Sequence, residues 1–364
     1  MRIDIIAGAR PNFMKIAPII DAIRIRQLDG SRLSFRLVHT GQHYDKAMSG
    51  RFFEELNIPD PEINLEVGSG TQAEQTGNIM VRYEKLLMDS PCDLCLVVGD
   101  VTSTMACSIA AKKLNIKVAH VEGGIRSFDL TMPEEINRMV TDSITDYFFT
   151  TSEVANQNLI KEGVDPTAIF FVGNTMIDTL LKNQSRFSQP PLWNDLNLKE
   201  KEYIILTLHR PSNVDTIHQL QNLLNEITLS AKHLPVIFPV HPRTRKTLLS
   251  ANLSWANLFC VDPLGYLEFN YLVKHAKAVI TDSGGVTEET TVLGVPCMTL
   301  RTSTERPETV TMGTNELLGI DPNAIRPAMQ KVFEGNWKQG TIPEKWDGEA
   351  AGRIVTALEK VLSV

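Results

Sequence analysis

The sequence predicts an α/β protein with two doubly wound parallel sheets, and three observations support this fold class. Short apolar runs alternate with longer helical patterns along all 364 residues. Most of the short runs are apolar on both faces, which is typical of parallel strands that helices cover on both sides. The alternation breaks once, at a polar segment near the middle of the chain. We therefore expect two Rossmann-like domains that face each other across a cleft, with ligands at the carboxyl ends of the strands.

The first half, residues 1–182, has the pattern of an N-terminal Rossmann-like domain. Its predicted strands are residues 2–7, 33–40, 94–98, 117–121, 147–151 and 169–172. Its predicted helices are residues 13–28, 71–88, 103–114, 134–144, 153–162 and 175–181.

Residues 183–202 are predicted to link the domains, because this segment is polar, contains Pro190-Pro191 and shows no clear period. The C-terminal domain, residues 203–348, has predicted strands at residues 203–208, 236–240, 258–261, 278–281 and 296–300. Its predicted helices are residues 216–232, 266–275, 286–293 and 323–334. A last helical pattern follows at residues 349–362.

The composition excludes several classes of protein. Hydrophobic residues make up 43% of the chain, enough to build cores, which excludes a disordered protein. With 36 Lys and Arg against 43 Asp and Glu, the formal net charge is −7, so we do not expect a nucleic acid as partner. The longest apolar runs are far shorter than the ~20 residues that span a bilayer, and the N-terminus lacks the pattern of a signal peptide. Five cysteines in so long a chain do not suggest a disulfide framework, so we expect a cytoplasmic protein without a membrane partner.

Two cations follow the first predicted strand. Gly8 permits a close approach of a ligand to the backbone, and the N-terminus of the next helix favours anions. Arg10 and Lys15 would add fixed positive charge, with Lys15 in the first turn of that helix. We interpret this turn as an anion site rather than as a turn with solvated cations.

Three carboxylates stand where predicted strands end or helices begin. Asp100 follows an apolar strand, where it could take part in chemistry or cap the next helix. Glu122 closes the strand at residues 117–121, and because Glu is a weaker cap than Asp we favour a functional role. Glu134 begins a helix and shares a face with Arg138, four residues on, which fits an exposed ion pair and a functional role equally well.

The second domain has two candidate features at strand ends. His209, beside an arginine, follows the strand at residues 203–208 and suits a phosphate or acid–base role. After the strand at residues 278–281, backbone N–H groups at a helix N-terminus predict a phosphate cradle. These N–H groups belong to Ser283, Gly284 and Gly285. Glu289, about one turn into the helix, could bind both hydroxyls of a ribose, as an acid does in dinucleotide-binding folds.

Two further patterns are similar to cofactor motifs, and we reject both. Cys92 and Cys95 have the spacing of a zinc or redox pair, but they run into a strand and no second Cys or His pair completes a zinc site. We interpret both as packing residues. Residues 68–73 are similar to a dinucleotide fingerprint, but they lie outside the first βαβ unit, and no acid-terminated strand follows at ~20 residues. We therefore expect no metal, no NAD and no other cofactor.

Taken together, the motifs resemble those of the non-hydrolysing UDP-N-acetylglucosamine 2-epimerases over nearly the whole chain. The matching blocks are GARPNFMKIAP (8–18), GDVTST (99–104), HVEGGIRS (120–127), PEEINR (133–138), GNTMIDTL (173–180), LHRPSNV (208–214), PVHPR (239–243), TDSGGVTEE (281–289) and TERPET (304–309). Any one block is a weak signal, whereas their order and spacing together are highly specific. The resemblance implies the glycosyltransferase-B arrangement, a homodimer, and a last helix within residues 349–364 that packs on the first domain. It also implies interconversion of UDP-GlcNAc and UDP-ManNAc without NAD or metal.

The resemblance also implies roles for the candidate residues. Contacts to UDP are implied for Arg10, Ser283, Gly284, Gly285 and Glu289. Phosphate or acid–base roles are implied for Lys15 and His209, and catalytic roles for Asp100, Glu122 and Glu134 with Arg138 beside them. Which of the three carboxylates is the base and which the acid stays open.

The chemistry of the implied reaction fits these residue types. The C2 proton of the sugar is barely acidic, because the neighbouring C1 is an acetal carbon and not a carbonyl. Departure of UDP from C1 acidifies C2–H, and elimination gives a 2-acetamidoglucal intermediate to which UDP adds back. Cations and amides would hold the leaving pyrophosphate. Carboxylates would exchange a proton on both faces of the ring.

Three segments depart from the pattern of well-known bacterial members of that family. They are Pro11-Asn12-Phe13, the residues 208–213, and Gln42-His43-Tyr44-Asp45. Some bacterial members bind a second, activating UDP-GlcNAc near the last of these segments, so this regulation stays open.

Several alternatives to the implied reaction also stay open. Related epimerases act on UDP-sugars with a second acetamido group or a uronate. A hydrolysing 2-epimerase usually lacks this spacing of Arg-Pro and Lys in the first block, and a glycosyltransferase of the same fold leaves the three carboxylates unexplained. A catalytically silent nucleotide-sugar sensor would not need the acidic residues and the histidine that this chain keeps.

Overall fold

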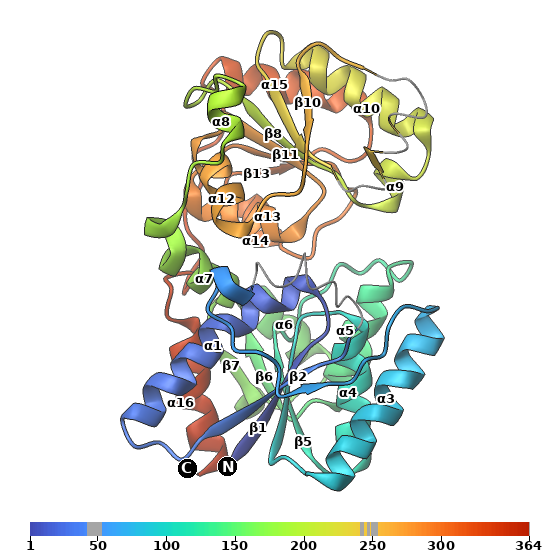
Figure 1. Cartoon of the computed structure of the whole chain (residues 1–364), viewed down its shortest axis with the longest axis vertical. Helices are drawn as coiled ribbons and strands as arrows, with labels where there is room; N and C mark the ends of the chain where they lie inside the picture. Colours follow the sequence, from blue (N-terminus) through green and yellow to red (C-terminus); the bar gives the residue numbers. More distant parts are fainter. Residues whose placement is uncertain (42–52, 241–243, 246–247, 249–253, 364) are drawn as a thin grey trace. The chain divides into compact units, whose positions relative to one another are not determined.

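The computed structural model describes residues 1–41, 53–240, 244–245, 248 and 254–363. The chain divides into two compact units, Met1–Lys182 with Glu344–Val364 and Asn183–Pro343 (Figure 1). Each unit is built on a parallel sheet with helices between its strands, so the predicted α/β class with two parallel sheets is confirmed. Among the helices of the described ranges, none is long and apolar enough to cross a membrane.

The first unit holds a 7-stranded sheet in the order β3-β2-β1-β4-β5-β6-β7. Its strands are β1 (Arg2–Ala7), β2 (Ser34–His39), β3 (Ile63–Asn64), β4 (Leu94–Val98), β5 (Lys117–Val121), β6 (Tyr147–Thr150) and β7 (Ile169–Phe171). Its helices are α1 (Arg10–Leu28), α3 (Gln72–Asp89), α4 (Thr102–Lys113), α5 (Pro133–Ile144), α6 (Glu153–Lys161), η1 (Pro166–Ala168), α7 (Thr175–Asn183) and α16 (Ala350–Leu362). The strand order reverses between β1 and β4, and in doubly wound sheets ligands bind at such a switch point.

The second unit holds a 6-stranded parallel sheet in the order β10-β9-β8-β11-β12-β13. Its strands are β8 (Ile204–Thr207), β9 (Val236–Pro239), β10 (Leu258–Val261), β11 (Ala278–Thr281), β12 (Cys297–Thr299) and β13 (Asn315–Leu317). Its helices are η2 (Gln184–Arg186), α8 (Leu192–Asp195), α9 (Pro211–Val214), α10 (Ile217–Ser230), α12 (Tyr266–His275), α13 (Gly284–Leu293), α14 (Pro307–Thr311), η3 (Pro322–Ala324) and α15 (Ile325–Phe333). Here the order reverses between β8 and β11.

The local sequence explains where the helices of the first unit begin. Thr71 and Glu74 form a capping box before α3, in which each side chain accepts the backbone N–H of the other residue. Helix α1 begins at Arg10, three residues earlier than predicted, with Pro11 in its first turn. The sequence predicted Lys15 in the first turn of this helix, but Lys15 lies in the second turn of α1.

Two short strands and the polar segment at residues 183–202 differ from the sequence-based expectations. The edge strands β3 and β13 contain only 2 and 3 residues, too few to show a periodic pattern. The segment expected to be a linker forms η2 and α8 and belongs to the second unit. The reason is its apolar content: the Trp193 ring packs edge-on against Tyr203 at 5.6 Å between ring centroids, and Leu198 is buried in the same cluster.

The last helix, α16, packs against α1 in the first unit. The segment before it is held closely: the indole N–H of Trp346 donates to the carbonyl of Thr151 at 3.1 Å. A Cβ on Gly173 would lie 2.0 Å from the carbonyl oxygen of Lys345, so only glycine fits there. The Asp178 carboxylate caps α16 by accepting its first two backbone N–H groups, at 3.1 and 2.7 Å.

This cap predicts a pH-dependent stability. Burial raises the pKa of Asp178 to about 6, helped by the nearby Asp347 and Glu349 and opposed by the two N–H bonds. Because this pKa exceeds the unfolded value of about 3.9, the group contributes stability below pH ~4 that is lost as pH rises through ~6. Asp178→Asn should remove this dependence, so the free energy of unfolding of the variant minus that of the wild type should rise by about 2 kcal/mol between pH 4 and 7.5. Urea titrations at several pH values measure this difference, and a constant difference across the range would contradict the assignment.

Candidate active site

The candidate residues of the first unit leave the sheet where β1, β4 and β5 end side by side. The register pairs Val98 with Val121, and the N–H of Gly99 donates to the carbonyl of Val121 at 3.0 Å. Gly99 and Glu122 are therefore neighbours just beyond the strands, and Asp100 follows directly. The parallel sheet brings together two of the three predicted carboxylates that are far apart in the sequence.

Lys15 and Glu122 form a buried ion pair across this edge. The Nζ of Lys15 lies 2.7 Å from Oε2 of Glu122, and their side chains are only 9% and 3% exposed. Gly99 makes room for the pair, since a Cβ there would lie 3.1 Å from Nζ and 3.7 Å from Oε2. A buried charge is tolerated only with a partner of opposite sign. The pair therefore holds a carboxylate and an ammonium group in fixed positions.

The backbone of Glu122 is held in an uncommon conformation. Its φ is +73°, in the left-handed region that residues with a Cβ rarely adopt. The conformation is fixed by the sheet, because the N–H of Glu122 donates to the carbonyl of Phe149 at 2.9 Å. Strain of this kind persists where the surroundings determine it and is concentrated at functional sites.

Asn12, which sequence analysis noted only as a departure from the family pattern, ties β1 to β4. Its Oδ1 accepts the N–H groups of Gly8 and Ala9 at 3.1 and 3.0 Å. Its Nδ2 donates to the carbonyl of Val98 at 2.8 Å. The buried amide thus fixes the turn before α1 against the end of the strand that carries Asp100.

Asp100 is held by Arg138 from α5. Its Oδ2 accepts Nη2 and Nε of Arg138 at 2.7 and 3.1 Å, and its side chain is 31% exposed. Of the two roles left open for Asp100, the structure does not support capping, because α4 has Val101 as N-cap residue and no side-chain cap. Asp100 therefore presents a partly exposed carboxylate that is already paired with a cation.

The sequence left the pairing of Arg138 with Glu134 open, and the structure pairs Arg138 with Asp100 and Glu135. Arg138 donates through Nη1 to Glu135, whose carboxylate also accepts the N–H and hydroxyl of Ser127, each at 3.0 Å. Glu135 is buried, whereas Glu134 is half-buried in the first turn of α5. Glu135 was not predicted as a site residue, because its neighbour Glu134 has the i, i+4 spacing to Arg138.

A second buried network of hydrogen bonds holds the backbone at the same sheet edge. The ring of His120 contacts Oδ1 of Asp142 through Nδ1 at 2.7 Å and the carbonyl of Gly99 through Nε2 at 2.8 Å. Arg126 donates to Oδ2 of Asp142 at 2.6 Å. Burial alone raises the pKa of Asp142, but His120 and Arg126 outweigh it and hold this pKa below its usual range. The network fixes the backbone of Gly99, and with it the position of the next residue, Asp100.

In the second unit, His209 follows β8 and is oriented by Asp282, which follows β11. Nδ1 of His209 lies 2.7 Å from Oδ1 of Asp282, while the imidazole is 60% exposed. Burial pushes the pKa of Asp282 up, but His209, the amide of Asn213 and the N–H of Arg210 outweigh it and hold this pKa below its usual range. A carboxylate on Nδ1 fixes the orientation of the ring and leaves Nε2 for a ligand. Asp282 was missed as a site residue because sequence analysis took it only as the start of the glycine-rich segment.

The predicted phosphate cradle lies at the start of α13. Ser283 is the N-cap residue, and its N–H donates to Oγ1 of Thr281 at 3.0 Å. The helix begins with Gly284 and Gly285, whose N–H groups stand in its first turn, where no helical carbonyl can accept them. A helix start of this kind favours an anion.

Glu289 lies in the second turn of α13 with its carboxylate buried. Nδ2 of Asn270 donates to its Oε1 at 3.4 Å. Burial raises the pKa of Glu289 to about 7, although Tyr266 and Asn270 oppose the shift through hydrogen bonds. A buried acid in this state can accept or donate a hydrogen bond near neutral pH.

Some predicted site features cannot be placed. Arg10 is the first residue of α1, but its side chain lies outside the described part of the structure. The same holds for residues 42–52, which include His43, and for residues 241–243 of the block at 239–243. Cys92 and Cys95 are buried and free, as expected of packing residues. Within the described ranges, no group of three or more His, Cys, Asp or Glu side chains is placed to hold a metal ion.

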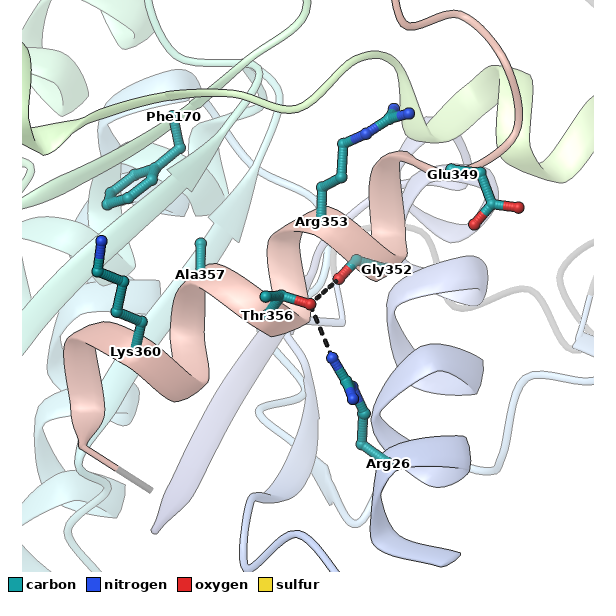
Figure 2. Close-up of a pocket in the computed structure, with 8 residues that line it drawn as sticks. All are labelled: Arg26, Phe170, Glu349, Gly352, Arg353, Thr356, Ala357 and Lys360. Atoms are coloured by element: carbon teal, nitrogen blue, oxygen red, sulfur yellow. Dashed lines mark hydrogen bonds between the residues drawn. The ribbon is translucent and has the colours of Figure 1, made fainter. Parts of the chain in front are cut away.

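A hollow of about 680 Å³ in the first unit lies along α16, away from the sheet edge (Figure 2). It is lined by Arg26, Phe170, Glu349, Gly352, Arg353, Thr356, Ala357 and Lys360, and none of these described residues is a predicted site residue. Two of its cations are already engaged: Arg26 donates to Oγ1 of Thr356 at 2.9 Å, and Arg353 pairs with Asp347 at 2.5 Å. The sheet edges therefore remain the candidate active site.

Comparison with known proteins identifies the family. The family model described as UDP-N-acetylglucosamine 2-epimerase matches residues 26–359. The chain belongs to the UDP-N-acetylglucosamine 2-epimerase family. It is 42% identical to the UDP-N-acetylglucosamine 2-epimerase of Methanocaldococcus jannaschii, covering 98% of this chain and 99% of the relative. The family is one of isomerases, as the sequence predicted.

Other members of the epimerase family differ in the substrate that they are named for. A Pseudomonas aeruginosa relative, UDP-2,3-diacetamido-2,3-dideoxy-D-glucuronate 2-epimerase, is 40% identical and covers 99% of this chain and 100% of the relative. Among solved structures, the M. jannaschii UDP-GlcNAc 2-epimerase in complex with UDP-GlcNAc and UDP is similar with a TM-score of 0.88. It is 41% identical, covering 99% of this chain and 100% of that structure.

The site geometry predicts that two carboxylates on Arg138 differ in their contribution to stability. Glu135→Gln removes the buried partner of a buried guanidinium and should lower the free energy of unfolding by about 3 kcal/mol. Asp100→Asn, at a partly exposed carboxylate, should lower it by less than about 1 kcal/mol. Urea denaturation of both variants measures the two values, and equal losses would contradict the assignment of Glu135 as the structural partner.

Proposed function

We propose that this chain catalyses the reversible epimerisation of UDP-GlcNAc to UDP-ManNAc at C2. The observation that carries the proposal is at the first sheet edge, where Asp100 and Glu122 follow the adjacent strands β4 and β5 and each is paired with a cation. The M. jannaschii relative with the same fold is named for this substrate and was solved with UDP-GlcNAc and UDP bound. The proposal joins this family membership to residues that can carry out the chemistry.

The reaction needs an elimination because the C2 proton is not acidic in the sugar itself. The C1–O bond breaks, its electron pair leaves with UDP, and a carboxylate takes the C2 proton. The 2-acetamidoglucal that results carries a C1–C2 double bond. UDP then adds back to C1 while a proton is delivered to the opposite face of C2. The same atoms are present before and after, so no oxidant, reductant or cofactor is consumed.

The second unit supplies the residues suited to the leaving diphosphate. The N–H groups at the start of α13 and the exposed imidazole of His209 are fixed hydrogen-bond donors. Such donors suit the negative charge that develops on the leaving diphosphate. Glu289, buried one turn further, is suited to the ribose hydroxyls. We also assign Arg10 and Lys15, which belong to the first unit, to binding the negative charge of the diphosphate.

The first unit supplies the proton chemistry. Glu122 beside Lys15 and Asp100 beside Arg138 are both carboxylates held by cations, whereas Glu134 in the first turn of α5 forms no ion pair with any described residue. Different environments give neighbouring acids different proton affinities, which is what a two-base epimerisation requires. We assign proton exchange to the three carboxylates as a set.

A second substrate is supported by one specific comparison. The P. aeruginosa relative named for a diacetamido glucuronate sugar is 40% identical, close to the 42% of the UDP-GlcNAc relative. The same elimination and re-addition applies to that sugar, because its C3 and C6 groups do not take part. The proposal further includes a homodimer, which the resemblance to the family supports.

Replacing the catalytic carboxylates tests the proposal. Asp100→Asn and Glu134→Gln should each lower the turnover of UDP-GlcNAc by at least ~100-fold, the usual scale for loss of an acid or base. The affinity for UDP, measured by calorimetry, should stay within about 3-fold, because neither carboxylate is assigned to binding the diphosphate. Turnover is measured as the initial rate of UDP-ManNAc formation by ion-exchange chromatography.

Asp165→Asn provides a matched control at an exposed carboxylate that caps η1 in the same unit. It should leave turnover within about 2-fold of the wild type. Turnover like that of the wild type in both Asp100→Asn and Glu134→Gln would sink the proposed mechanism.

A further inference from the structure

Arg301 is a buried cation at the end of β12 in the second unit. It is 5% exposed, and its Nη2 donates to Oε2 of Glu305 at 2.5 Å. Its Nη1 is also buried and has no hydrogen-bond partner among the described residues. Buried donors are almost always hydrogen-bonded in folded proteins. The free side of this guanidinium therefore points to a ligand.

The guanidinium and its carboxylate partner lie over the first residue of α13. A Cβ built on Gly284 would be 3.9 Å from Nη1 of Arg301 and 2.8 Å from Oε1 of Glu305. A side chain at this position would have to displace the end of the Glu305 carboxylate. The buried donor of Arg301 and the N–H groups of the first turn of α13 thus face the same small volume.

The Glu305 carboxylate lies at this volume. The start of a helix carries partial positive charge and stabilises a nearby carboxylate. Together with Arg301, it offers Glu305 the same contacts that it would offer a phosphate group. The Glu305 carboxylate is therefore an anion of the protein itself that lies in the predicted phosphate cradle at the start of α13.

We propose that Arg301 binds the diphosphate of UDP and that Glu305 holds its place until the nucleotide displaces it. The inference rests on the proposed function, because it takes a uridine diphosphate as the ligand. A guanidinium presents a planar fork of N–H groups that matches phosphate oxygens, and Nη1 is available for such a contact. Two anions cannot share one helix N-terminus and one guanidinium without repulsion, so the diphosphate and Glu305 compete.

Competition predicts opposite effects for the two members of the pair. Arg301→Gln should weaken UDP binding by at least ~10-fold, the scale for loss of one charged hydrogen bond. Glu305→Gln should strengthen UDP binding by about 3- to 10-fold, because an anion no longer competes. Uridine, which lacks the diphosphate, should bind each variant within about 2-fold of the wild type. Calorimetry with UDP and with uridine measures all of these affinities.

An ion pair between α15 and α10 of the second unit provides the control. Nε of Arg326 lies 2.9 Å from Oε1 of Glu226. Arg326→Gln removes this pair and should leave the ratio of UDP affinity to uridine affinity unchanged within about 2-fold.

Several results would overturn the inference. If Glu305→Gln weakens UDP binding, or if both variants lower UDP and uridine binding in parallel, the Arg301–Glu305 pair is only structural. If Arg301→Gln does not fold, the sign of the Glu305→Gln effect still decides. If the wild type binds UDP but neither variant changes UDP binding selectively, only this inference is overturned. If the wild type binds no UDP, the proposed function is overturned as well.

Discussion

Buried charges at the carboxyl ends of parallel strands are the feature on which the site depends. A charge removed from water must meet a partner of opposite sign, and the sheet decides which partners can meet. Lys15 contacts Glu122 because β1 and β5 both lie beside β4 in the sheet. Helix α1, which carries Lys15, follows β1, and Glu122 follows β5. Arg138 reaches Asp100 because α5 follows β5 back across the same edge. The sheet and these two ion pairs therefore fix the positions of Glu122 and Asp100.

The second unit uses one carboxylate for orientation and another for binding. Asp282 has a lowered pKa because His209 and several N–H groups outweigh its burial, so it remains an anion that orients the imidazole. Glu289 has a pKa raised to about 7, because its burial is opposed by fewer donors. The contrast shows how one sheet edge gives two acids different proton affinities through their surroundings alone. The same logic separates the buried Glu135 from the partly exposed Asp100.

The sequence predicted the fold class because apolar strands and helical patterns are local signals. It also predicted Asp100, Glu122, His209 and the start of α13 as candidate residues, since all of them lie shortly after apolar strands. The partners of these residues could not be predicted, because each partner comes from another element. Helix α5 shows the reason most clearly: its buried face is polar and includes Glu135 and Arg138, whereas Ile136 and Met139 are exposed. A helix with its polar side inward reverses the usual rule for finding a core, and only the three-dimensional contacts reveal it.

In the proposed reaction, the proton at C2 is exchanged while UDP is detached from C1. A proton NMR time course of UDP-GlcNAc with the protein in D2O tests this claim most directly. The account predicts that a UDP-ManNAc signal grows while deuterium enters C2 of both sugars, because the carboxylates exchange their protons with solvent. Formation of UDP-ManNAc with the original C2 proton retained would contradict this route. Release of free ManNAc and UDP in place of UDP-ManNAc would contradict the proposed reaction itself.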